Sequence, residues 1–157
     1  YFEGCSNGGR QALQEAQRYP NDFDGIIAGA PVLDFTGLVT GEAWDLKKLH
    51  ATETSSDIPI DKLAVIGAAV LARCDAVDGL EDGLINDPRQ CDPRPETLQC
   101  PHNHDAANCL TTVQVNALKA IYGGPRNSRG QQLYPGFPAG GETPLHRVAA
   151  SSASPMM

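Results

Sequence analysis

The chain opens on Tyr1-Phe2-Glu3-Gly4-Cys5-Ser6-Asn7-Gly8-Gly9-Arg10, and the Gly4-x-Ser6-x-Gly8 pattern within this stretch decides the fold. Such a pattern is typical of a nucleophile elbow, a sharp turn between a strand and a helix that presents a serine hydroxyl. We expect a strained backbone at Ser6. A Cβ atom at Gly4 or Gly8 would crowd the approach of strand and helix, so glycine is expected at both positions.

The residues that follow the turn support this interpretation over a plain glycine-rich surface loop. Residues 11–19 are mostly good helix formers with apolar residues at helical spacing, and Pro20-Asn21 ends the segment. Residues 23–31 then supply a short apolar run between turn residues, as in a buried parallel strand. An elbow, a helix and a buried strand in this order predict an α/β fold, part of an α/β-hydrolase core.

These segments resemble the nucleophile region of the tannase and feruloyl esterase family. The resemblance is carried by residues 4–11, by Tyr19-Pro20, and by Asp24-Gly25-Ile26-Ile27-Ala28-Gly29-Ala30-Pro31. A cysteine directly before the serine is its distinguishing mark. The resemblance implies that Ser6 is the nucleophile and that the Asn7 backbone N–H is an oxyanion donor. It also implies that Cys5 forms a disulfide with a cysteine that follows the catalytic histidine.

Length and charge limit the other possibilities. A chain of 157 residues with 41% hydrophobic and 20% charged residues suits one ordinary globular domain. A net charge of −7 without a Lys/Arg cluster argues against nucleic acid or an anionic membrane as a partner. No apolar run approaches the roughly 18 residues of a membrane span. The chain starts inside a motif and lacks an initiator methionine, so we expect the true N-terminus to be missing.

Five cysteines indicate an oxidising compartment, such as the periplasm or the extracellular space. The pairs Cys74/Cys91 and Cys100/Cys109 suit two local disulfides, and Cys5 is left over. Zinc is the alternative, but it would favour C-x-x-C pairs, which the sequence lacks. His102 and His104 lie between Cys100 and Cys109; we interpret them as exposed residues of a disulfide loop rather than metal ligands.

Two helices are expected beyond the elbow region. Pro59 opens the first, and its apolar stripe, a core face, consists of Leu63, Ile66, Gly67, Val70, Leu71 and Cys74. The second runs from about Thr112 to Tyr122, with a capping box at Thr111-x-x-Gln114 and a stop at Gly123-Gly124-Pro125. Residues 32–56 read as helical turns and loops. Residues 126–142 read as an irregular loop in which Tyr134 and Phe137 pack.

The segment 75–87 carries five acidic residues and no basic one. It is either a solvated turn or a calcium site, because the glycine turns between Asp75, Asp78 and Asp82 could fold these carboxylates inward. It is not an EF-hand, since both the Asp-x-Asp-x-Asp-Gly start and the closing Glu are absent.

The family resemblance favours calcium, because the family's lid domain contains a disulfide-closed loop of the form Cys-Asp-x-x-Asp-Gly-x-x-Asp-Gly. It implies carboxylate ligands from Asp75, Asp78 and Asp82 and backbone carbonyl ligands from Leu80 and Leu84, with Glu81 pointing outward. The calcium ion would be structural.

A catalytic acid and base are not evident. A serine nucleophile needs a histidine oriented by a carboxylate, and the histidines here are His50, His102, His104 and His146. The first three fall in the expected lid, and His146 falls in a divergent tail. We therefore assign residues 1–31 to the catalytic core, 32–142 to the lid and 143–157 to the tail, and expect an incomplete, inactive piece of an enzyme.

The leading hypothesis is a serine carboxylesterase for aromatic acyl esters, such as plant polyphenol or cell-wall esters. The alternative is a calcium- and disulfide-stabilised module without catalysis, in which residues 4–9 are a loop. A peptidase is a further alternative, which the acidic loop and the Cys5-Ser6 pair disfavour. The sequence does not indicate an oligomeric state.

Overall fold

A computed structural model describes residues 1–50 and 56–142. In this part of the chain the fold is mixed α/β, with two strands, four α-helices and two disulfides. The chain forms two compact units, Tyr1–Thr40 and Gly41–Met157, which are described separately below. The boundary between the units falls at a later residue than the predicted end of the core at residue 31, and the domain assignment stays a prediction. No helix of the described ranges is long and apolar enough to cross a membrane.

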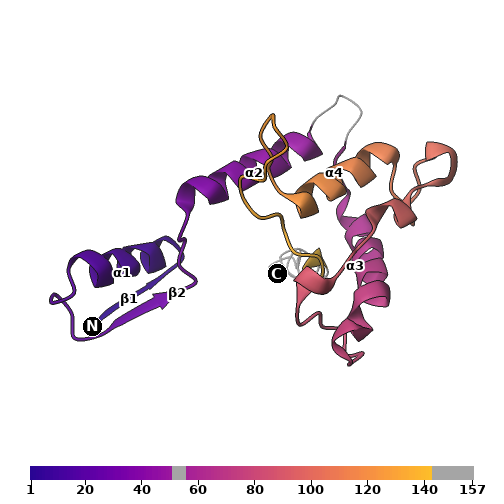
Figure 1. Cartoon of the computed structure of the whole chain (residues 1–157). Coiled ribbons are helices and arrows are strands. Elements are labelled where there is room, and N and C mark those ends of the chain that lie inside the picture. The colour runs from indigo at the N-terminus through magenta and orange to yellow at the C-terminus, as the bar shows by residue number, and fades with distance from the viewer. Residues whose placement is uncertain (51–55, 143–157) are drawn as a thin grey trace, which may run out of the picture. The chain divides into compact units, whose positions relative to one another are not determined.

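The first unit is a strand–helix–strand unit. Strands β1 (Phe2–Cys5) and β2 (Ile26–Gly29) pair in parallel, with Phe2 opposite Ile26 and Cys5 opposite Gly29. Helix α1 (Asn7–Arg18) connects them and packs along both strands (Figure 1). The predicted helix and parallel strand are confirmed, although α1 begins directly after Ser6. The predicted burial of the strand is not found in the described residues, because Ile27 is 60% exposed and the other residues of β2 are only half-buried.

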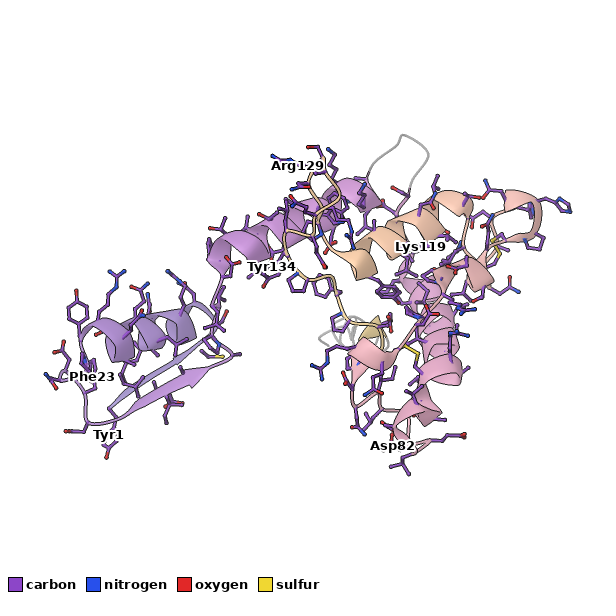
Figure 2. The ribbon with its side chains drawn as sticks, viewed as in Figure 1. Tyr1, Phe23, Asp82, Lys119, Arg129 and Tyr134 are labelled. Atoms are coloured by element: carbon purple, nitrogen blue, oxygen red, sulfur yellow. A yellow bond between two sulfur atoms is a disulfide. The ribbon has the colours of Figure 1, made fainter. Side chains whose placement is uncertain are left out.

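Helix α2 (Phe35–Leu49) is one regular helix where the sequence predicted helical turns and loops. Asp34 begins it, because its carboxylate accepts a 2.8 Å hydrogen bond from the Gly37 N–H. In the second unit, a Cβ atom at Gly41 would lie 3.3 Å from the Tyr134 ring, so the ring packs closely on the helix backbone (Figure 2). Packing of this kind outweighs the weak helix propensity of the threonines and glycines in α2.

The core of the second unit lies between α3 (Ile60–Cys74) and α4 (Thr112–Gly123). Its buried residues are Ile66, Val70, Leu110, Val115, Leu118 and Ala139. The predicted stripe on α3 is confirmed, with Leu63 partly buried at its edge. The Thr111/Gln114 capping box of α4 is also confirmed, since both of its reciprocal hydrogen bonds are present.

Short 3-10 helices and disulfides organise the segment between α3 and α4. The disulfides Cys74–Cys91 and Cys100–Cys109 are those predicted. The predicted packing of Tyr134 is confirmed by its contact with Gly41, but that of Phe137 is wrong, because 59% of this side chain is exposed. Phe137 instead lines an open surface pocket with Tyr122 and neighbouring prolines.

Candidate active site: the turn at Ser6

Ser6 occupies the turn between β1 and α1 with a strained backbone. Its φ of 58° and ψ of −116° lie in a region that L-residues rarely adopt, as predicted. The Ser6 N–H donates a 3.0 Å hydrogen bond to the carbonyl oxygen of Gly29, at the end of β2. The Ser6 carbonyl accepts hydrogen bonds from the N–H groups of Arg10 (3.1 Å) and Val32 (3.4 Å). Hydrogen bonds to β2, to α1 and to the chain after β2 therefore hold the strained turn in place.

Of the two glycines predicted to allow close packing at the turn, one has this role and the other does not. A Cβ atom at Gly4 would lie 2.3 Å from the carbonyl oxygen of Gly8, which confirms that Gly4 allows the close approach of β1 and α1. The same prediction for Gly8 is wrong, because a Cβ atom there would meet no atom within 4 Å. The second closely packed glycine is Gly9, where a Cβ atom would lie 2.4 Å from the Gly29 carbonyl oxygen. The Gly8-Gly9 pair in the sequence is the signal for this contact.

The N-terminus of α1 has no hydrogen bond to the side chain of its N-cap residue. Serine is a favourable helix N-cap, yet the Ser6 side chain makes no capping hydrogen bond. The first N–H groups of a helix have no partner within it and carry partial positive charge. The Asn7 N–H is the first of these groups, next to the Ser6 hydroxyl. This arrangement suits an oxyanion donor beside a nucleophile, and the two roles stay predictions.

The structure does not bring a base to Ser6 within the first unit, because residues 1–40 contain no histidine. In the second unit, His50 Nδ1 lies 2.9 Å from Asp57 Oδ1, with both side chains exposed. His102 and His104 are exposed in the Cys100–Cys109 loop, as predicted. His146 lies outside the described residues, as does the rest of the predicted tail. The catalytic acid and base remain unassigned.

Cys5 ends β1 as a free, exposed thiol. It precedes Ser6 directly, so a disulfide at this position would tie another segment to the turn at Ser6. The predicted partner is not in this chain, and the bridge stays a prediction.

The acidic loop folds back on Asp75, the first residue of the short helix that follows α3 (Figure 2, where Asp82 marks the loop). The Asp75 carboxylate accepts hydrogen bonds from the N–H groups of Gly83 (3.1 Å) and Asp82 (3.3 Å). Gly79 and Gly83 make the two turns with φ values of 95° and 80°, a conformation that favours glycine. The predicted glycine turns are therefore present.

The other two aspartates make local turns. Asp78 and Asp82 each accept a 3.0 Å hydrogen bond from the N–H two residues later, that of Leu80 and Leu84 respectively. The second carboxylate oxygen of Asp78 also accepts from the Asn86 side-chain amide (2.7 Å) and from the Asn86 N–H (3.4 Å). Within residues 1–50 and 56–142, no group of three His, Cys, Asp or Glu side chains is arranged to hold a metal. The oxygen-only donor set is of the type that calcium takes, and a carboxylate has about four lone-pair sites, more than these hydrogen bonds use. Calcium binding stays a prediction.

Asp87, in the same acidic segment, has a different partner. Arg89 Nε lies 2.7 Å from one of its carboxylate oxygens and Gln90 donates to the other, and these hydrogen bonds lower the pKa of Asp87 well below its usual range. The Arg89 cation already neutralises this carboxylate, and Asp75, Asp78 and Asp82 stay the candidate ligands.

A parallel strand pair, a serine at positive φ and a helix that begins directly after the serine define a strand–turn–helix unit of a mixed α/β protein. The chain belongs to the tannase and feruloyl esterase family, whose model matches residues 1–154. The match extends past residue 142 into the segment that was predicted to be a divergent tail.

Individual relatives agree with this assignment. A probable feruloyl esterase B from Emericella nidulans is 37% identical over 142 residues, which are 90% of this chain and 27% of that protein. An uncharacterized esterase from Xanthomonas campestris is 44% identical over 87% of this chain and 24% of its own length. The crystal structure of feruloyl esterase B from Aspergillus oryzae superposes with a TM-score of 0.77 at 32% identity, over 92% of this chain and 29% of that one. The chain thus spans about a quarter of the length of these relatives.

Proposed function

We propose that this chain supplies the nucleophile of a longer serine carboxylesterase that hydrolyses aromatic acyl esters. The observation that carries the proposal is the strained backbone of Ser6 between β1 and the open N-terminus of α1, in a chain of this family. The feruloyl esterase names of the relatives support an aromatic acyl group as the substrate. The substrates would be small aromatic esters, plant polyphenol esters or cell-wall esters.

In the proposed reaction, the Ser6 hydroxyl attacks the ester carbonyl carbon while a base removes its proton. The carbonyl oxygen becomes an oxyanion, which the Asn7 N–H stabilises by a hydrogen bond. Collapse of this intermediate expels the alcohol, which takes up the proton, and leaves an acyl group on Ser6. Water then releases the aromatic acid by the same steps. The base and its carboxylate partner come from residues outside this chain.

The second unit would serve as the lid of this enzyme. Its core is small, and the two disulfides stabilise it. We include in the proposal a structural calcium ion held by the carboxylates of Asp75, Asp78 and Asp82 and the carbonyls of Leu80 and Leu84. The disulfides also support a secreted or periplasmic location.

The test is hydrolysis of a feruloyl ester by the full-length protein that contains this chain. We expect Ser6→Ala to abolish hydrolysis and covalent labelling by a serine-directed phosphonate. Ser128→Ala, at an exposed turn of the second unit, is the matched control and should keep both. Labelling that survives Ser6→Ala contradicts the proposal, and a full-length protein that neither hydrolyses nor labels favours a non-catalytic module.

A further inference from the structure

Arg10 makes two contacts beside the nucleophile turn that the proposed reaction does not use. Its Nε donates a 3.0 Å hydrogen bond to the side-chain oxygen of Asn7, one helical turn earlier in α1. Its guanidinium carbon lies 5.8 Å from the centre of the Phe35 ring, at the start of α2 and within the same compact unit. A cation within about 6 Å of a ring centre is attracted to it. Arg10 is therefore held at both sides.

The hydrogen bond from Arg10 to Asn7 lies at the N-terminus of α1, where few side chains can accept a hydrogen bond. The first three residues of α1 are Asn7, Gly8 and Gly9, so Asn7 has the one side chain there that can accept a hydrogen bond. Asparagine side chains at helix N-termini readily accept hydrogen bonds from nearby backbone N–H groups. In this turn the same N–H groups would face the oxyanion. An unrestrained Asn7 amide could thus occupy the donors that the reaction needs.

We propose that Arg10 is a positioning residue, which holds the Asn7 side-chain oxygen away from the N-terminal N–H groups of α1 and so keeps the oxyanion donor open. Phe35 fixes the guanidinium from the other side. The inference rests on the proposed function of Ser6 and Asn7. Arg10 itself does not touch the reacting atoms; it acts through the Asn7 amide.

This role predicts a specific kinetic pattern in the full-length protein with a feruloyl ester. Arg10→Ala should lower kcat by on the order of tenfold to a hundredfold, the range in which small displacements of catalytic groups act. KM should change by less than about twofold, because the contact affects an interaction made in the transition state. Arg18→Ala removes the same charge at the other end of α1 and is the matched control, with kcat and KM unchanged.

A double-mutant cycle with Asn7 separates this role from a general effect of charge or packing. Asn7→Ala removes the competing amide and keeps the backbone N–H. In that background Arg10→Ala should change kcat by less than about twofold. An equal loss of kcat in both backgrounds overturns the inference, as does an Arg10→Ala variant that behaves like Arg18→Ala.

Two controls keep the outcome clear. Arg10→Met keeps the aliphatic stem and replaces Arg10→Ala if the alanine variant unfolds, as judged by its circular dichroism and Tm. Ser6→Ala is measured in parallel. If Ser6→Ala keeps its activity, the proposed function fails; if it loses activity and the Arg10 variants show no coupling to Asn7, the positioning role alone fails.

Discussion

The N–H of Ser6 donates a 3.0 Å hydrogen bond to the carbonyl oxygen of Gly29, which joins the strained turn after β1 to the last residue of β2. The same carbonyl oxygen lies where a Cβ atom of Gly9 would have to fit. One peptide group of β2 thus both fixes the turn at Ser6 and limits the side chain that α1 can carry beside it. The conformation of Ser6 therefore depends on β2 as well as on its own motif.

We expect Gly9→Ala to destabilise the full-length protein by about 1–3 kcal/mol, the usual cost of overpacking. The added Cβ would lie 2.4 Å from the Gly29 carbonyl oxygen and 3.0 Å from the Pro31 Cα, both backbone atoms. The matched control is Gly8→Ala, where the Cβ meets nothing within 4 Å and where alanine favours the helix. Urea unfolding measures both free energies; equal stabilities of the two variants would contradict the role of Gly9.

The sequence predicted those parts of the fold that local patterns determine. The Thr111/Gln114 capping box and the α3 stripe depend on spacing within one helix, and both are confirmed. The sequence predicted only helical turns and loops where α2 forms, because the stability of this helix comes from contacts distant in sequence. The Trp44 indole donates to the Ala120 carbonyl (3.0 Å), and the Tyr134 ring packs on Gly41. The one local signal was Asp34, which accepts from the Gly37 N–H at the start of the helix.

Removal of calcium should lower the Tm of the second unit by several degrees, since an ion that binds only the folded loop stabilises it. Calcium should restore the Tm and magnesium should do so poorly, because magnesium requires a tighter octahedral geometry. Asp78→Asn should abolish the effect, whereas Glu81→Gln, an exposed acid in the same loop, is the control that keeps it. A melting curve that does not respond to a chelator would rule out the calcium site.

Alkaline pH should destabilise the second unit through Tyr122. Burial and the hydrogen bond that its hydroxyl donates to Glu142 raise the pKa of Tyr122 above its ordinary value of 10.0. A raised folded-state pKa means that the stabilisation is fully present below pH 10 and decreases as the pH rises above it, by at most about 1.4 kcal/mol per pH unit.

We therefore expect the unfolding free energy to fall less steeply above pH 10 in Tyr122→Phe than in the parent. Tyr19→Phe, at an exposed tyrosine, is the control and should keep the parent's pH dependence. The measurement is urea unfolding at pH 8 and at pH 11, followed by circular dichroism. Identical pH dependence in the parent and Tyr122→Phe would show that Tyr122 does not cause the effect.

The candidate site was predictable to the extent that it lies within the first ten residues. The strain at Ser6 and the close approach at Gly4 follow from the motif, and both are present. Gly8 was assigned the packing role that belongs to Gly9, because the motif alone does not show which glycine faces β2. The acid and base could not be located, since a triad is brought together by the fold and not by sequence spacing.

The most direct test of the central claim is to locate the covalent adduct in the full-length protein after reaction with a serine-directed phosphonate. Trypsin cleaves after Arg10, so mass spectrometry of the peptide that ends at this residue reports modification of Ser6. We predict one phosphonyl group on Ser6 and loss of esterase activity in proportion to its occupancy. An adduct on another serine, with Ser6 unmodified and activity lost, would contradict the assignment of Ser6 as the nucleophile.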